Sequence, residues 1–197
     1  MAESLRGKRV AILATDGVEQ IELTSPREAL EQAGAKCVLI SPKEGEIQGV
    51  KHHDKADKLN VELSLSKADA SDFDAVLLPG GVINADALRI DKKAQQFVQE
   101  IDRAGKPVMV ICHGPWLLIS AGLMKARVIA SWPTLQDDIQ NAGGTWRDEK
   151  VIRDRNWVSS RKPDDLPAFN EESIKLMESQ SGKTARAEDR ETRDVRA

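Results

Sequence analysis

Short, unbroken runs of apolar residues recur along the chain, separated by amphipathic or polar stretches. They stand at Val10–Ala14, Cys37–Ile40, Ala75–Leu78 and Pro107–Ile111. A short apolar run with no polar position inside it is typical of a strand buried on both faces of a parallel sheet. The pattern therefore predicts that these four runs form the core of one sheet.

Helix signals stand between the runs. Ser25 reads as an N-cap, with Pro26 at the first helical position and Glu28 two residues further on, and Gly34 supplies the stop. This spacing predicts a helix ending at Gly34. Further helices are expected over about Asp86–Ala104, Trp116–Ala121, about Pro133–Asn141 and Ala168–Met177.

The remaining segments carry weaker strand signals. Glu46–Val50 and Asn60–Leu65 could form a small hairpin or an excursion at the sheet edge. Val128–Ala130 could form a short strand, and Thr145–Ile152 a pair with Trp157–Ser160. The order is mostly strand, helix, strand, helix. That alternation predicts an α/β fold, a mostly parallel sheet with helices on both faces and active groups beyond the carboxyl ends of its strands.

Composition narrows the class of protein. A chain of 197 residues, 40% hydrophobic and 31% charged, suits a single domain, which we expect over residues 1–177. Residues 178–197 are charged or small and predict a disordered tail. No apolar run approaches the roughly 20 residues of a membrane span, and the first residues lack a signal peptide, so we expect a cytoplasmic protein. A net charge of −3 without a basic face predicts no nucleic-acid partner.

The chain has two cysteines and three histidines, and no CxxC motif. A reducing cytosol favours free thiols over a disulfide, and the histidine count argues against structural zinc. We expect no metal and no cofactor. Cys37 lies inside an apolar run, where a cysteine behaves as a small core residue.

Cys112 has a different setting, since it lies between an apolar run and the expected start of a helix. Unpaired N–H groups and the positive end of the helix dipole would favour the thiolate and lower the pKa of the thiol. The stretch also matches a nucleophile elbow, in which the N–H of the next residue, His113, helps to bind an oxyanion. Val110 stands where such elbows usually have a small residue. The alternative is an inert, buried cysteine at a strand end.

Four neighbours bear on this choice. Gly80 and Gly81 follow the adjacent strand and could bring backbone N–H groups to a developing anion, or could merely form a tight turn. Glu19 and Glu22 would share one side of a helical turn. A carboxyl in that crevice would hold its proton and donate a hydrogen bond to the thiolate, although a solvated surface is the commoner place for glutamate.

Aromatic and histidine side chains complete the candidate set. His113 could act as a base, but adjacent side chains on a turn often point apart. Trp116 and Trp132 could line a pocket, or could pack in the core or at an interface. We assign no catalysis to His52 and His53, which are expected at the surface.

At these residues the chain resembles the PfpI/ThiJ superfamily, also called the DJ-1 superfamily, over about Lys8 to Met177. Five ordered blocks carry the resemblance, and together they are far more specific than any one of them. They are Asp16–Glu22, Leu78–Gly81, Ile111–Trp116, Ser131–Pro133 and Arg161–Phe169.

The resemblance implies a flavodoxin-like three-layer sandwich related to the class I glutamine amidotransferases. It implies that Cys112 is a nucleophile, with Glu22 as its acidic partner, Glu19 close by and His113 as the next catalytic member. In the PfpI branch an acidic residue from a neighbouring subunit completes the triad, and Asp86 is the matching position. A homo-oligomer, a dimer or larger, follows. Oxyanion or substrate contacts are expected from Gly80, Gly81, His113 and Trp116.

Three functions remain open. The first is a stress-protective cysteine hydrolase or deglycase that acts on methylglyoxal-type adducts, because a thiolate with oxyanion donors suits attack on small carbonyl or glycated substrates. An intracellular cysteine peptidase is the alternative within the enzyme class. The second is an oxidative-stress sensor or chaperone that works through oxidation of Cys112. The third is a purely structural role.

Overall fold

The computed structural model of the chain describes residues 3–194, and side chains as far as residue 180. Within this part, the main sheet has seven strands in the order β11-β12-β8-β7-β1-β3-β6. All neighbouring strands are parallel except β11 and β12. The strands are β1 Arg9–Leu13, β3 Lys36–Ser41, β6 Leu63–Ser64, β7 Ala75–Leu78, β8 Val108–Ile111, β11 Val151–Asp154 and β12 Trp157–Ser160.

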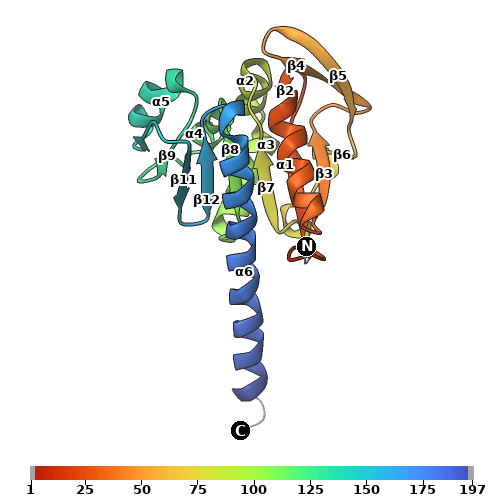
Figure 1. Ribbon diagram of the computed structural model, residues 1–197, viewed down its shortest axis with the longest axis vertical. Helices are drawn as coiled ribbons and strands as arrows, with labels where there is room; N and C mark the ends of the chain where they lie inside the picture. The colour runs from red at the N-terminus through yellow and green to blue at the C-terminus, as the bar shows by residue number, and fades with distance from the viewer. Residues whose placement is uncertain (1–2, 195–197) are drawn as a thin grey trace.

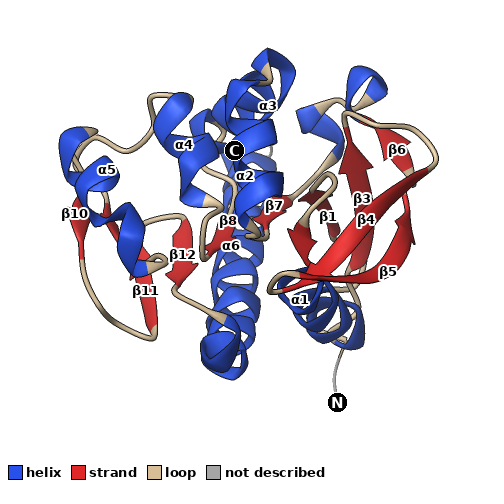
Figure 2. Cartoon of the chain, turned by 90° about the horizontal axis from the view of Figure 1, so that it is seen from above, coloured by secondary structure: helices blue, strands red, loops and turns tan. Residues whose placement is uncertain are grey.

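Helices cover both faces of this sheet (Figure 1, Figure 2). One face carries α1 (Gln20–Gln32) and α6 (Leu166–Asp194), and the other carries α2 (Val82–Ile90), α3 (Lys92–Arg103) and α4 (Pro115–Ser120). Strand β1 explains the apolar runs, because its alternate residues enter two different cores. Val10 and Ile12 pack with the first layer, whereas Ala11 and Leu13 pack with the second. The predicted α/β sandwich is confirmed.

Two small sheets flank the main one. One combines β2 (Val18–Glu19), β4 (Glu46–Lys51) and β5 (Asp54–Asn60), and the other pairs β9 (Val128–Ile129) with β10 (Thr145–Trp146). The hairpin partner of β4 is thus not Asn60–Leu65, which instead supplies β6 to the main sheet. The helical segments that complete the fold are α5 Gln136–Asn141, η1 Leu65–Lys67, η2 Ala70–Asp72, η3 Pro133–Leu135 and η4 Pro163–Asp165.

The polar strand β5 is held by a tertiary contact that periodicity cannot reveal. The amide of Gln20 donates to the Asp57 carboxylate at 2.7 Å and accepts from the Asp57 N–H at 2.8 Å. Gly49 of β4 leaves room for this amide, because a Cβ there would lie 2.8 Å from Gln20 Oε1. The hairpin is therefore fastened to the first turn of α1.

Two helix boundaries differ from the sequence expectation. Helix α1 begins at Gln20, so Ser25 and Pro26 lie inside it rather than at its start. The expected helix over Asp86–Ala104 is two helices, because the Asp91 carboxylate accepts from two N–H groups at the start of α3, at 2.8 and 3.1 Å. This capping supplies the first turn of α3 with hydrogen-bond partners and ends α2.

Helix α6 also runs past its expected end at Met177, continuing to Asp194 and projecting beyond the sheet (Figure 1). The helical backbone over 178–194 differs from the expected disordered tail. The physical reason is composition, since alanine, glutamate, lysine and arginine have high intrinsic helix propensity. Residues 195–197 lie outside the described part. That residues 1–177 form the single domain stays a prediction. No helix in the described part is long and apolar enough to cross a membrane.

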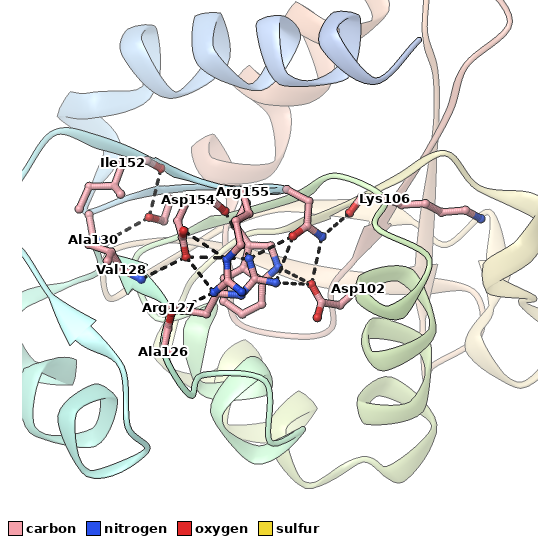
Figure 3. A network of polar contacts seen from close by, with 12 residues as sticks. Asp102, Lys106, Ala126, Arg127, Val128, Ala130, Ile152, Asp154 and Arg155 are labelled. Atoms are coloured by element: carbon pink, nitrogen blue, oxygen red, sulfur yellow. Dashed lines mark hydrogen bonds and ion pairs between the residues drawn. The ribbon is translucent and has the colours of Figure 1, made fainter. Parts of the chain in front are cut away.

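A buried polar network joins α3 to the β11–β12 side of the sheet (Figure 3). The guanidinium of Arg127 lies 4.0 Å from the centroid of the Trp157 ring and donates to the Asp102 carboxylate at 2.7 Å. The same carboxylate oxygen accepts from Asn156 at 3.0 Å and from the Trp157 indole at 2.7 Å. This network lies where β8 and β12 begin, whereas Cys112 follows the end of β8, so we assign the network a structural role.

Candidate active site

Cys112 follows the last residue of β8 on a strained turn. Its φ is +61°, in the left-handed region, where a non-glycine residue costs roughly 1–3 kcal/mol. Two backbone hydrogen bonds hold it there: its N–H donates to Ser160 O at 3.1 Å, and its carbonyl accepts from the Trp132 N–H at 3.0 Å. Gly114 lets the chain turn tightly into α4, because a Cβ there would lie 3.0 Å from Val110 Cγ2. This turn is an elbow with Val110 in place of a small residue.

The end of β7 packs directly against this elbow. A Cβ at Gly80 would lie 2.6 Å from the Cys112 Cβ and 2.5 Å from Glu22 Oε2, so glycine is required for this close approach. The Gly80 N–H donates to Glu22 Oε2 at 2.8 Å, and it is therefore occupied. Gly81 follows with φ +87°. Of the two glycines, Gly81 is the one whose N–H reaches the cysteine.

Three polar groups converge on the Cys112 sulfur. The backbone N–H groups of Gly81 and His113 lie beside it and favour its thiolate form. The side chain of His113 turns back toward the elbow, so that Nδ1 lies 3.2 Å from Sγ. The two adjacent side chains thus point toward each other. The two backbone N–H donors are able to stabilise a negative charge that develops beside the sulfur.

The pKa of Cys112 moves in the opposite direction from the sequence expectation. Burial raises the pKa of the thiol, and the nearby Glu22 raises it further when its carboxyl is ionised, whereas the N–H groups of Gly81 and His113 oppose both effects. The sulfur lies in an apolar crevice with Cys112 only 7% exposed, which favours the neutral thiol. The helix N-terminus alone does not overcome that burial.

The proton of Glu22 is part of this balance. Glu22 is fully buried, and burial raises the pKa of its carboxyl to about 8, with a smaller contribution from Glu19; the hydrogen bonds from Gly80 and Cys112 act the other way. The carboxyl is therefore protonated at neutral pH and is able to donate toward sulfur. A neutral Glu22 removes the repulsion that would otherwise oppose a thiolate at Cys112.

Glu19 and Asp86 lie apart from the sulfur. The Glu19 carboxylate accepts from the His52 N–H at 2.9 Å, so it fastens the β4–β5 turn rather than contacting Cys112. Asp86 is exposed on the outer side of α2 and has no contact with Cys112 within the described chain. Both His52 and His53 are exposed, as expected.

Tryptophans surround the catalytic candidate His113. Its ring lies 5.2 Å from the Trp116 ring, edge to face, and 5.9 Å from the Trp132 ring in a stacked arrangement. Burial lowers the pKa of His113. The imidazole is thus neutral at physiological pH, as a proton acceptor must be.

Sequence reasoning missed Asn84, a fully buried residue in the first turn of α2. Its side chain accepts from the Thr15 N–H at 2.7 Å and donates to the carbonyls of Pro79 and Gly80 at 3.1 and 2.9 Å. It therefore holds the end of β7 in place beside the elbow. The signal that could have found it is a polar amide three residues after Gly81 in an otherwise apolar turn.

A pocket of about 430 Å³ lies beside Glu19, between the β4–β5 hairpin, α1 and the loop after β12. Its walls are mainly apolar, with a lysine at the rim. The pocket lining comprises Glu19, Gln20, Ile21, Thr24, Val50, Lys51, His52, Ala56 and Pro163.

No cluster of three or more potential metal ligands occurs among the described residues. The second cysteine, Cys37, is buried in β3, and burial raises the pKa of its thiol to about 12.

Residues 8–176 match the DJ-1/PfpI family. The protein YraA of Bacillus subtilis, whose name describes a candidate cysteine protease, is 42% identical over 86% of this chain and 98% of its own length. The deglycase TK1284 of Thermococcus kodakarensis is 41% identical over 86% of this chain and 99% of its own.

A solved structure gives the same grouping. A two-domain protein from Anabaena variabilis, with DJ-1/ThiJ/PfpI-like and ferritin-like domains, superimposes with a TM-score of 0.81 and 33% identity over 85% of this chain. The chain spans 47% of that protein.

Proposed function

Because the chain belongs to the DJ-1/PfpI family, we propose that it is a stress-protective cysteine deglycase, a hydrolase in which Cys112 attacks methylglyoxal-type adducts of amines. The observation that carries this proposal is the convergence on Sγ of two N–H groups and of His113 Nδ1 at 3.2 Å. An inert strand-end cysteine needs none of these groups. The name of a relative at 41% identity also supports deglycase chemistry.

The proposed reaction needs no oxidant and no cofactor. The thiol proton of Cys112 passes to His113, the sulfur attacks the carbon that bears the amine, and a C–S bond forms as the C–N bond breaks. The proton leaves with the amine. The bound three-carbon unit then isomerises to a thioester, and water hydrolyses it to a hydroxy acid and the free thiol. Protonated Glu22 hydrogen-bonds to the sulfur while it carries charge, and the N–H groups of Gly81 and His113 stabilise the oxyanions.

The proposed site also uses a second copy of the chain. Within the described residues, His113 has no acidic partner, while Asp86 stands exposed one turn along α2 from the exposed side chains of Val82 and Ile83, which are 52% and 66% accessible. We propose that a homo-oligomer brings Asp86 of a neighbouring copy to the site. Gly80 and Trp116 then serve as packing and wall residues around the substrate.

The test compares two cysteines in one chain. Cys112→Ser is expected to lose amine release from methylglyoxal-treated N-acetyl-lysine, while Cys37→Ser, the matched control, keeps it. Amine and hydroxy acid are measured together, and circular dichroism checks the fold. Full turnover in folded Cys112→Ser would overturn the proposal.

A cysteine peptidase is the second candidate function. The name of the relative at 42% identity favours it, and the apolar pocket beside Glu19 offers room for a substrate side chain. Fluorogenic peptides separate the two activities. Hydrolysis of peptides that depends on Cys112, with no amine release from adducts, would establish the peptidase instead. Modification of Cys112 by peroxide, with neither activity, would establish the sensor.

A further inference from the structure

The imidazole of His113 is enclosed by two indole rings. His113 is 8% exposed, with Trp132 stacked on it at an interplanar angle of 26° and Trp116 against it at 62°. A histidine beside a cysteine on a turn has several rotamers available, and most of them would carry Nδ1 away from sulfur. The rings fill that space, which leaves the rotamer with Nδ1 3.2 Å from Sγ.

Trp116 is itself held from two sides. Its indole N–H donates to Asp138 Oδ2 at 2.8 Å, which ties α4 to α5. On α2, the Arg89 guanidinium lies 5.2 Å from the Trp116 ring centroid, and Arg89 Nε donates to Ser120 Oγ at 3.2 Å. Both contacts fix the ring that faces His113.

Trp132 is held by the elbow. Its backbone N–H donates to the Cys112 carbonyl at 3.0 Å, so its position follows that of the cysteine. The indole then extends over His113. Trp132 thus contacts both members of the proposed proton-transfer pair, one through its backbone and the other through its side chain.

We propose that Trp132 and Trp116 are positioning residues that hold the His113 imidazole against the Cys112 sulfur. The proposal rests on the proposed function, in which a proton passes between these two residues. It gives the two tryptophans that pack against His113 a role in the proposed function. Neither indole needs to touch the reacting atoms, since each acts through His113.

The first experiment observes His113 directly. The chain has three histidines, so its imidazole Hε1 signals are few enough to assign, with the exposed His52 and His53 as internal references. Spectra are recorded at about pH 8, where imidazoles are neutral. In Trp132→Leu we expect the His113 signal to move toward the two references, because the ring current of the stacked indole is lost. Trp132→Phe keeps a ring and should retain most of the shift.

The second experiment measures the consequence for chemistry. Trp132→Leu is expected to lower kcat about tenfold with KM unchanged, since misplacement of a catalytic group affects turnover. Asp138→Ala removes the exposed carboxylate that accepts from the Trp116 indole N–H, and it should lower kcat by less than Trp132→Leu does. If Trp132→Leu does not fold, Asp138→Ala tests the positioning role instead. An unshifted His113 signal with wild-type turnover in either folded variant would overturn the proposal. If the wild-type chain releases no amine from adducts, the proposed function fails, while the His113 signal and the rate of Cys112 alkylation still decide the positioning role.

Discussion

Glu22 is an ionisable residue that the fold buries completely. Its pKa in the folded chain, about 8, lies above the ordinary value of 4.5, so the folded state binds a proton that the unfolded state releases between these two pH values. The stability that this proton confers is complete below pH 4.5 and is lost as the pH rises through about 8. Burial of this carboxyl therefore makes the free energy of unfolding fall as the pH rises from 4.5 to about 8.

Glu22→Gln is expected to remove this pH dependence. Glutamine keeps an acceptor for the Gly80 N–H and a donor toward sulfur, but it does not titrate. Between pH 4.5 and 8, the free energy of unfolding of the wild type should fall relative to that of the variant by up to about 1.4 kcal/mol per pH unit. Urea unfolding at several pH values measures this difference. Parallel curves for the two proteins would contradict a raised pKa at Glu22.

Gly80 is a residue whose lack of a side chain is a requirement of the site. In Gly80→Ala, the new Cβ would meet the Cys112 Cβ at 2.6 Å, which forces β7 and the elbow apart. We expect a loss of about 1–3 kcal/mol in stability and a faster alkylation of Cys112 as the crevice opens. Gly105→Ala is a comparison in which no atom lies within 4 Å of the added Cβ, although its φ of +68° adds backbone strain. Slow, wild-type alkylation in Gly80→Ala would show that the elbow tolerates the methyl group.

At the scale of elements, the Arg127 network fastens α3 to the β11–β12 pair (Figure 3). The Arg127 side chain is 7% exposed, and desolvation by this burial lowers the pKa of Arg127 despite the attraction of Asp102. Such a group stabilises a fold chiefly because its removal leaves a buried partner charge unpaired.

Arg127→Met is therefore expected to destabilise the chain by about 3–5 kcal/mol. The matched control is Arg155→Ala, whose side chain is 57% exposed and whose ion pair with Asp154 spans 3.4 Å, and it should change stability by less than about 1 kcal/mol. Chemical denaturation gives both values. Equal losses of stability in the two variants would contradict the expectation that the buried Arg127 pair stabilises the fold more than the exposed Arg155 pair does.

At the scale of the whole molecule, the exposed apolar side chains bear on association. Within the part of the chain with described side chains, the exposed large hydrophobic residues are Ile21, Val82, Ile83 and Ile90. Three of these start α1 or α2, and Ile83 lies over Gly17, where a Cβ would approach the isoleucine Cβ to 2.5 Å. Exposed apolar side chains at the start of α2, four residues or fewer from Asp86, suit the proposed contact with a second copy.

In the proposed homo-oligomer, we expect Ile83→Lys to lower the mass measured by light scattering and, with it, the turnover of adducts, because the proposed contribution of Asp86 from the neighbouring copy would be lost. Ile90→Lys, at the far end of α2, is the comparison and should leave the mass unchanged. Turnover that persists undiminished in a monomer would show that Asp86 does not act across an interface.

The sequence alone determined the layers of this fold. Strands β1, β3, β7 and β8 lie at the four predicted apolar runs, Val10–Ala14, Cys37–Ile40, Ala75–Leu78 and Pro107–Ile111. A strand that is buried on both faces needs apolar side chains at every position, so its sequence is an unbroken apolar run. The sequence also indicated Cys112 as a candidate, because a cysteine between such a run and the start of a helix faces unpaired backbone N–H groups. The predicted helix ends were less accurate. The start of α1 was missed because Pro26 lies inside the helix, and the break at Asp91 was missed because it depends on side-chain capping of α3.

Only the tertiary structure decided the chemistry of the site. Sequence proximity suggested a lowered pKa for Cys112, yet the burial of the sulfur raises it, and Glu22, 90 residues away in sequence, raises it further when its carboxyl is ionised. Likewise, it is the packing of Trp116 and Trp132 that turns His113 toward sulfur, and it is Glu22 that occupies the Gly80 N–H. Desolvation and hydrogen-bond direction depend on atoms from several elements at once, whereas periodicity records only which face of one element is buried.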